Sequence, residues 1–283
     1  MTDFWTRLTN GPCYIIAEAG INHDGSLMKA QALIDAAKNA GADAVKFQLY
    51  RADELTLPGP HRDMLATLQI GVDEMKWLKS YADSKGIDFL CSPFDIESAK
   101  ALKDMGVKAL KIGSGEFTNL PFLHAARDMG IPLIISTGMC TQEEWEDVSQ
   151  DARWGDVAWL HCVSAYPSPI AGYNLKCMEV MRDTYEYPEV VGLSDHTIGD
   201  TLPIAAVAMG AKILEKHITL CFEDEGPDHA ASMEPGEFAL MVQKIRQVES
   251  AMGDGVKRPT PEEMKTMKYA RRVQTAEGFK RAP

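Results

Sequence analysis

The stretch EVVGLSDHTIGDTLPIAAVAMGAKILEKH, residues 189–217, contains the pattern that decides the fold. Two short apolar runs, residues 189–194 and 211–215, are typical of β-strands, and the segment between them is helix-like. Each run leads into a histidine, His196 after the first and His217 after the second. If the strands are adjacent and parallel, both imidazoles reach one rim of one sheet, where neutral nitrogen donors can hold a metal ion. One histidine at a strand end is usually structural, but this pair predicts a metal site.

Six more apolar runs precede this stretch, and helical segments separate them. The runs are continuous rather than alternating, as expected for parallel strands covered on both faces. Eight strand-then-helix units in about 250 residues predict a single (β/α)₈ TIM barrel over residues 1–252, followed by a short tail, residues 253–283, with one helix at 261–272. An open doubly wound sheet is the alternative, but no Gly-x-Gly-x-x-Gly follows the first strand. The six runs are residues 13–18, 44–48, 87–92, 107–112, 132–136 and 157–162.

Composition excludes several classes of partner. The formal net charge is −12 over 283 residues, which argues against binding to nucleic acid or to an acidic membrane surface. The six cysteines form no CxxC pair and are expected to be free thiols in a reducing compartment. No segment approaches the roughly 18 apolar residues of a membrane span. We therefore expect a cytoplasmic protein with neither nucleic-acid nor membrane partners.

Polar side chains gather where the predicted strands end, which is the active-site face of a TIM barrel. Lys46 and Lys111 lie inside apolar strands, where an inward ammonium needs an anionic partner or acts as a Schiff-base amine. Ser114, Ser136 and Ser194 add hydroxyl donors, and the glycines beside the first two let backbone amides approach a phosphate. Together these residues predict an anion pocket beside the two histidines. The other polar residues at strand ends are Glu18, Gln48, Ser92, Glu116, Ser164, Tyr166 and Glu215.

The ordered motifs of the chain resemble those of the sialic acid (N-acetylneuraminate) synthases. The resemblance covers Tyr14 to about Arg272. It implies a metal-dependent (β/α)₈ barrel that condenses phosphoenolpyruvate with a sugar aldehyde similar to N-acetylmannosamine, giving a sialic-acid-type 2-keto-3-deoxy acid and phosphate. The motifs are IAEAGINHDG (16–25), AVKFQ (44–48), SPF (92–94), KIGSGE (111–116), ISTGM (135–139), LHCVSAYP (160–167), GLSDHT (192–197), EKH (215–217) and GPDH (226–229).

The same resemblance implies a role for each site residue. His196 and His217 would ligate a divalent metal, Mn²⁺ in the usual description of the family, with Mg²⁺ or Co²⁺ as alternatives. Glu18 or Glu215 would deprotonate the water that attacks C2 of phosphoenolpyruvate. The phosphate would be held by Ser114, Ser136, Ser164 and Ser194, the carboxylate by Lys46, Lys111 and Ser92, and the sugar by Glu18, Gln48, Glu116, Tyr166 and Asp228.

The expected departure from the family lies after the barrel. Family members usually continue into a small antifreeze-like domain, which in a swapped dimer covers the barrel of the partner. We expect this chain to lack that domain, to form a homo-oligomer, and to rely on a separate polypeptide if a cap is needed.

Two other functions are compatible with the same residues. A class I aldolase would use Lys111 or Lys46 as a Schiff-base nucleophile, and a non-catalytic homologue would bind sugar or act as a scaffold. Polar residues at all the strand ends weigh against the scaffold, because buried polar groups are costly. Of the remaining histidines, His161 is expected in the core, whereas His23 and His229 lie in rim loops and either orient substrate or are structural.

Overall fold

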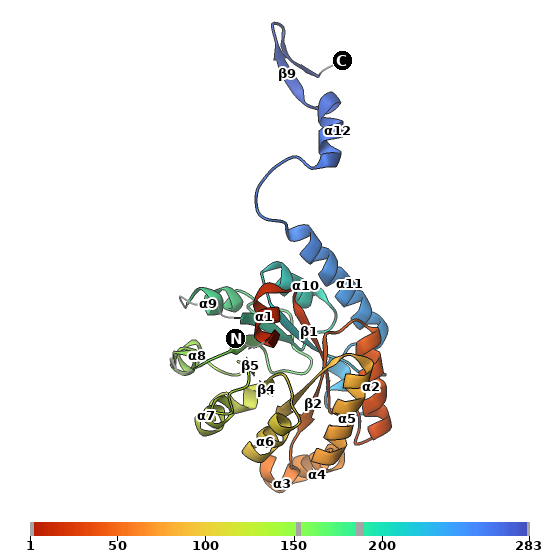
Figure 1. The fold of residues 1–283 in the computed structure, drawn as a ribbon, viewed down its shortest axis with the longest axis vertical. Helices are drawn as coiled ribbons and strands as arrows, with labels where there is room; N and C mark the ends of the chain where they lie inside the picture. The colour runs from red at the N-terminus through yellow and green to blue at the C-terminus, as the bar shows by residue number, and fades with distance from the viewer. Residues whose placement is uncertain (1–2, 151–153, 185–189, 282–283) are drawn as a thin grey trace. The chain divides into compact units, whose positions relative to one another are not determined.

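The computed structural model describes residues 3–150, 154–184 and 190–281. Eight parallel strands pair in chain order, and β1 also pairs with β8, so the sheet closes into a barrel (Figure 1). This confirms the (β/α)₈ TIM barrel. Each strand lies where it was expected, although its first or last residue can differ from the expected one. The largest difference is in β4, which begins at Leu110 rather than Val107. The strands are β1 (Tyr14–Gly20), β2 (Ala44–Leu49), β3 (Asp88–Pro93), β4 (Leu110–Ile112), β5 (Leu133–Ser136), β6 (Val157–Cys162), β7 (Val190–Asp195) and β8 (Ile213–His217).

Helices surround the strands in chain order (Figure 1). Side chains cap several helix ends: Asp95 accepts a hydrogen bond from the Ser98 amide, and Thr141 and Glu144 form a reciprocal capping box. Gly86 ends its helix in the left-handed conformation, at φ 67°. The helices are α1 (Asp3–Asn10), α2 (Leu27–Asn39), α3 (Ala52–Leu55), α4 (Pro60–Leu68), α5 (Val72–Lys85), α6 (Ile96–Asp104), α7 (Leu120–Arg127), α8 (Gln142–Ser149), α9 (Cys177–Asp183), α10 (Thr201–Ala208) and α11 (Pro235–Met252), with the 3₁₀ turns η1 (Ser114–Glu116) and η2 (His229–Ala231).

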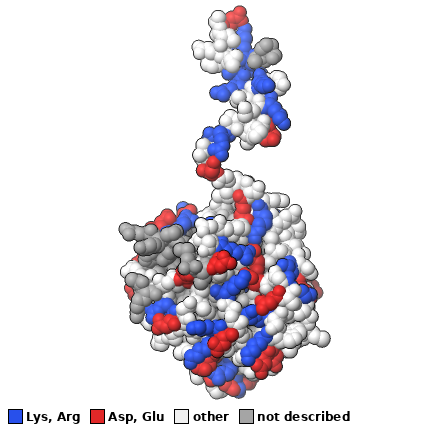
Figure 2. All heavy atoms as spheres, viewed as in Figure 1, with Lys and Arg blue, Asp and Glu red and all other residues white. Residues whose placement is uncertain are grey.

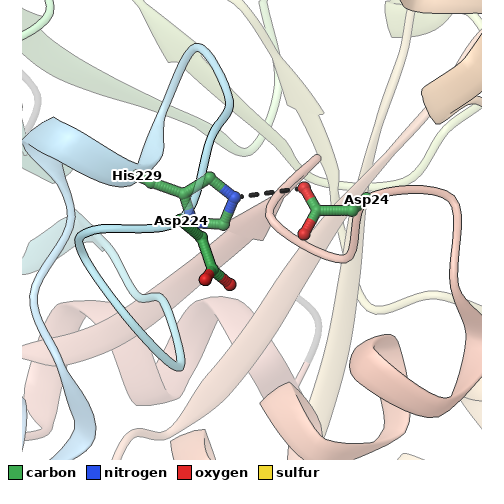
Figure 3. A group of neighbouring side chains, drawn as sticks. All are labelled: Asp24, Asp224 and His229. Carbon is green, nitrogen blue, oxygen red and sulfur yellow. Dashed lines mark hydrogen bonds and ion pairs between the residues drawn. The ribbon is translucent and has the colours of Figure 1, made fainter.

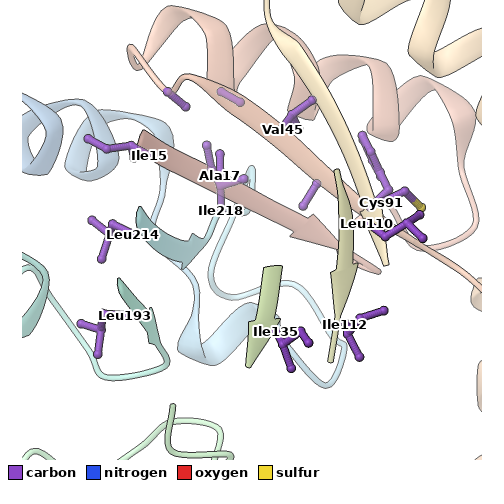
Figure 4. Close-up of a cluster of buried hydrophobic side chains, with 14 of the residues drawn as sticks. Ile15, Ala17, Val45, Cys91, Leu110, Ile112, Ile135, Leu193, Leu214 and Ile218 are labelled. Atoms are coloured by element: carbon purple, nitrogen blue, oxygen red, sulfur yellow. The ribbon is translucent and has the colours of Figure 1, made fainter. Parts of the chain in front are cut away.

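Alternation along the strands separates two buried layers. Outward residues such as Ile15, Val45 and Leu214 join the large apolar cluster between strands and helices (Figure 4). Inward residues at the beginnings of the strands, such as Ile16 and Leu90, form a second cluster with Phe4, Trp5 and Leu8 of α1. The helix α1 thus closes the N-terminal end of the barrel with apolar side chains, and inward polar side chains are left to the opposite end.

The surface on the face drawn in Figure 2 mixes basic and acidic side chains. Within the described residues, none of the helices is both long and apolar enough to span a membrane. All six cysteines are free, and Cys13, Cys91 and Cys162 are buried.

The described structure divides into two compact units, Met1–Glu249 and Ser250–Pro283, whereas the expected boundary followed Met252. The second unit contains α12 (Pro261–Ala270), which begins with a capping box between Thr260 and Glu263. It also contains a two-stranded antiparallel sheet, β9 (Arg272–Thr275) with β10 (Gly278–Arg281), that the sequence patterns did not predict. Neither α12 nor this sheet buries a residue, so their stability within this unit comes from local bonds.

Candidate active site

A cavity of about 320 Å³ opens at the carboxyl ends of the barrel strands. Its lining combines lysines, carboxylates, hydroxyls and two imidazoles, and most of them come from inward positions on different strands. Phe94, Met139 and Cys162 add less polar surface. The polar lining residues are Glu18, Lys46, Gln48, Ser92, Lys111, Ser114, Ser136, Ser164, Tyr166, Ser194, His196, Glu215 and His217.

Two lysines and two carboxylates form the charged floor of the cavity. Lys46 Nζ lies 3.3 Å from Glu18 Oε2 and 3.2 Å from Glu215 Oε2, and it donates to Ser92 Oγ at 3.1 Å. Lys111 Nζ lies 3.5 Å from Glu215 Oε1. All four side chains are at most 4% exposed. Both inward lysines therefore have carboxylate partners, which the strand patterns alone could not reveal.

Burial and pairing give these groups different proton affinities. Burial raises the pKa of Glu18 to about 7, against the opposing effect of Lys46. Burial would also raise the pKa of Glu215, but Lys111 and Lys46 together lower it below its ordinary value. Burial lowers the pKa of Lys111. Burial would also lower the pKa of Lys46, but Glu18 and Glu215 together raise it above its ordinary value. Glu215 and Lys46 thus stay charged, and Glu18 can exchange a proton near neutral pH.

Hydroxyl groups surround one side of the cavity. Ser114 Oγ accepts a hydrogen bond of 3.0 Å from the Gly138 amide, and Ser136 Oγ is buried with no hydrogen-bond partner among the described residues. A Cβ at Gly138 would lie 2.2 Å from Ser164 Oγ and 2.7 Å from Ser114 Oγ. Only glycine at this position therefore leaves both hydroxyls in place. An orphaned buried hydroxyl and a close-packed pair of serines fit an anion with several acceptor oxygens.

The two histidines, His196 and His217, lie on the other side of the cavity, with ring centroids 5.2 Å apart. His196 Nδ1 lies 2.9 Å from the Val163 carbonyl, so Nδ1 carries the proton and Nε2 is left as a donor atom. His217 Nδ1 is buried without a hydrogen bond to any described residue, 3.7 Å from Asp228 Oδ2. Burial, followed by His196, lowers the pKa of His217 well below its ordinary value and keeps this imidazole neutral. Contacts with Cys162 and the Val163 carbonyl outweigh burial and raise the pKa of His196, so a metal there would have to displace a proton from this ring. The neutral His217 ring and the unbonded Nε2 of His196 fit a divalent metal.

A set of rim contacts connects the loop after β1 to the loop after β8 (Figure 3). His229 Nε2 lies 3.1 Å from Asp24 Oδ1, and its Nδ1 lies 2.7 Å from Thr219 Oγ1. Lys29 Nζ bonds both Asp24, at 2.6 Å, and Asp224, at 3.2 Å. These contacts hold the loop that carries Asp228, so His229 has a structural role here.

Comparison with known proteins gives the family. The NeuB family model matches residues 33–257. The chain belongs to the NeuB family. It is 40% identical to the N,N'-diacetyllegionaminic acid synthase of Legionella pneumophila over 92% of this chain and 79% of that protein. It is 36% identical to the N-acetylneuraminate-9-phosphate synthase of Homo sapiens over 89% and 75%. A crystal structure of the N-acetylneuraminic acid synthetase of Leptospira borgpetersenii superposes with a TM-score of 0.85, at 35% identity over 93% of this chain and 94% of that one.

This membership confirms the resemblance to the sialic acid synthases, and the structure adds where each site residue lies. Asp228 does not line the cavity, but its Oδ2 lies 3.7 Å from Nδ1 of His217, which does. Glu116 does not line the cavity: it lies in η1, where its carboxylate accepts from Asn119 Nδ2 at 2.7 Å. The turn that brings Ser114 into the cavity directs Glu116 away, which adjacency in sequence could not show.

Other histidines of this NeuB-family chain lie outside the cavity. His161 lies in the core as expected, with Nε2 2.7 Å from the Tyr173 carbonyl. His23 accepts a hydrogen bond from the Gly25 amide, and burial lowers its pKa to about 4. The strand patterns missed Cys162 as a lining residue, although it lies two positions after inward Leu160 and therefore shares its face.

Proposed function

We propose that this protein condenses phosphoenolpyruvate with a sugar aldehyde, similar to N-acetylmannosamine, and releases phosphate and a 2-keto-3-deoxy acid of the sialic acid type. One observation carries the proposal: an anion-binding half, with two lysines and several serine hydroxyls, shares a single cavity with a pair of histidines. The names of the relatives, which are synthases of legionaminic acid and of N-acetylneuraminate 9-phosphate, support the same class of reaction.

Lys46, Lys111 and Ser92 would hold the carboxylate of phosphoenolpyruvate. Ser114, Ser136, Ser164 and Ser194 would hold the phosphate, and Ser194 Oγ also donates to Glu215 Oε1 at 3.2 Å. These donors are already in position, so they stabilise charge during the reaction without moving.

His196 and His217 would hold a divalent metal, Mn²⁺ or alternatively Mg²⁺ or Co²⁺. When bound, the metal would polarise the aldehyde carbonyl as a Lewis acid. The C2–C3 π electrons of phosphoenolpyruvate form the bond from C3 to the aldehyde carbon, which leaves C2 electron-deficient. The carbonyl π pair moves to the aldehyde oxygen, which takes up a proton from the solvent and becomes a hydroxyl. Gln48, Tyr166 and Asp228 would position the sugar beside this carbon.

We assign deprotonation of the attacking water to Glu18 rather than Glu215. The water oxygen bonds to C2 and its proton passes to Glu18, whose pKa of about 7 suits transfer at neutral pH. Glu215 is held ionised by two lysines and acts as their counter-charge. The bond between C2 and the bridging oxygen of the phosphate group then breaks, and phosphate leaves with the bonding pair. C2 becomes the ketone carbon as its hydroxyl loses a proton.

Phosphate release tests this proposal. The purified protein is incubated with phosphoenolpyruvate, Mn²⁺ and a panel of N-acetylated, free and phosphorylated aldoses. We expect release with an N-acetylated aldose, loss of release in EDTA and recovery with Mn²⁺. His196→Ala and His217→Ala should abolish release, whereas the control His61→Ala, on an exposed position of α4, should retain it. No release with any aldose would refute the proposal.

One observation favours a second candidate. Burial lowers the pKa of Lys111, which increases the fraction of neutral amine available for a Schiff base. An aldolase would then be trapped by borohydride in the presence of pyruvate, and the trapped adduct would be absent from Lys111→Met. Activity that survives EDTA together with this adduct would favour the aldolase over the condensation.

A further inference from the structure

A fully buried ion pair lies directly beside the two histidines. Lys216 Nζ bonds Asp195 Oδ2 at 2.7 Å, and both side chains are 0% exposed. Thr197 completes the group: its amide and its hydroxyl each donate to the Asp195 carboxylate at 3.1 Å, and its carbonyl accepts from Lys216 Nζ. Both carboxylate oxygens of Asp195 are therefore occupied.

The position of this group follows from the strand register. Asp195 and Lys216 are Cα partners in the β7–β8 pairing, one residue before His196 and His217. Alternation along each strand turns these two side chains to the outer face of the barrel, whereas the histidines line the cavity. Lys216 bonds the residues on both sides of His196, so it anchors the backbone of one histidine from the strand that carries the other.

Stability alone does not account for such a pair. Removing two charges from water costs several kcal/mol per ion, and well-packed apolar residues often replace a buried pair without loss. Apolar contacts are not directional, whereas each hydrogen bond of this group fixes the position of one backbone segment relative to another. The group thus constrains the offset between β7 and β8 at the level of the histidines.

We propose that the Asp195–Lys216–Thr197 group positions His196 and His217 as a preformed metal-binding pair. The proposal rests on the proposed function, because it requires a metal at these histidines. The three residues act through the histidines and touch neither substrate nor metal. They are positioning residues, and their loss should weaken metal affinity even in the absence of substrate.

Metal binding without turnover tests the proposal. Free Mn²⁺ is counted by its electron paramagnetic resonance signal during titration of the full chain with Mn²⁺. We use Asp195→Asn/Lys216→Met, which removes both charges together and keeps an oxygen for the Thr197 amide. We expect the Kd for Mn²⁺ to rise by at least about tenfold, the range typical of residues that orient metal ligands.

A matched control uses a second lysine–aspartate pair. Lys244 Nζ bonds Asp200 Oδ2 at 2.5 Å at a more exposed site, so Asp200→Asn/Lys244→Met removes the same two charges away from the cavity. Its Kd for Mn²⁺ should stay within about twofold of the parent chain, within the small effects usual for surface pairs. If the control weakens Mn²⁺ binding as much as the test variant, the effect is one of general charge and the proposal fails.

Thr197→Val keeps the group falsifiable if the double variant fails to fold. Valine preserves the shape of threonine and removes only the hydroxyl, so we expect a rise of about threefold in Kd, the cost of a modest hydrogen bond. Thr197→Ser, which restores the hydroxyl, should return the Kd to the parent value. A folded double variant, or Thr197→Val, with the parent Kd would overturn the positioning role.

Two further measurements separate this inference from the proposed function. In steady state, the double variant should need more Mn²⁺ for half-maximal rate, with an unchanged KM for phosphoenolpyruvate, because the anion half of the cavity is untouched. If the parent chain and His196→Ala bind Mn²⁺ equally, the metal site itself is wrong and both proposals fall. If His196→Ala loses binding while the double variant keeps it, only the positioning role is refuted.

Discussion

Gly138→Ala is expected to weaken phosphoenolpyruvate binding while leaving the barrel folded. The added Cβ would lie 2.2 Å from Ser164 Oγ, 2.7 Å from Ser114 Oγ and 3.1 Å from Ser114 Cβ. Hydroxyl groups can rotate away from such a contact at little cost to the fold. The rotation, however, removes both hydroxyls from the positions where we place the phosphate.

The size of the effect follows from the two lost bonds. A hydrogen bond to a charged group contributes about 1.5–3 kcal/mol, so two of them at the lower limit contribute about 3 kcal/mol. Since each 1.4 kcal/mol is a factor of ten, the kcat/KM for phosphoenolpyruvate should fall by about 100-fold. Phosphate release at varied phosphoenolpyruvate measures this ratio, and thermal unfolding measured by circular dichroism checks the fold.

Two other glycines provide matched controls. Gly236 lies in α11 outside the cavity, and a Cβ there would meet nothing within 4 Å, so Gly236→Ala should leave the kinetics unchanged without destabilising the protein. At Gly192 on β7, a Cβ would lie 2.2 Å from the Ile213 carbonyl oxygen, which is backbone and cannot rotate away. Gly192→Ala should therefore unfold the protein. A Gly138→Ala variant with the parent kcat/KM would refute the placement of phosphate beside Ser114 and Ser164.

Three further predictions test other parts of the structure. Because burial raises the pKa of Glu18 to about 7, its basic form appears as pH rises through that value, and activity should rise with it. The rise should be absent from Glu18→Gln. A rise with the same midpoint in that variant would contradict the assignment of Glu18 as the base. Trp5→Ala should destabilise the protein by about 3–5 kcal/mol in urea unfolding, because it opens a cavity in the apolar closure of the barrel, with KM values unchanged; a shift in KM would show that the two ends are coupled. Lys29→Met removes the cation shared by Asp24 and Asp224 and should raise the KM for the sugar by up to about fivefold, the limit for a surface pair, without affecting phosphoenolpyruvate. An equal change in both KM values would place the effect elsewhere.

The strand patterns predicted the barrel well because continuous apolar runs and the helical segments between them are local properties of the sequence. The run Val157–Cys162 was expected with the bounds that the structure shows, and the inward direction of Lys46 follows from apolar neighbours on both sides. The strand β4 was expected to be longer; only Cys91 and Leu110 pair between β3 and β4, and Lys108 instead reaches the surface and pairs with Asp88. Whether the residues before Leu110 join the sheet depends on the position of the neighbouring strand, and the local sequence does not contain that information.

The charge partners were not predictable from local patterns. Glu215 meets Lys46 and Lys111 across the barrel interior, and those contacts exist only because the sheet closes. Glu116 is a further case, since one 3₁₀ turn decides whether it follows Ser114 into the cavity or bonds Asn119. Sequence could therefore nominate most of the lining residues but not their pairing.

The apolar closure by α1 has a consequence for the order in which the chain assembles. Phe4, Trp5 and Leu8 are the first large apolar residues described, yet their cluster includes Ala44 on β2 and Ile213 on β8. The ribosome releases α1 before the barrel strands, but the docking surface of α1 is complete only after the last strand has joined β1. This helix should therefore pack onto the barrel last. The burial of Trp5 should therefore coincide with the slowest step of refolding, and fluorescence would report it in a variant that keeps Trp5 and replaces the other four tryptophans.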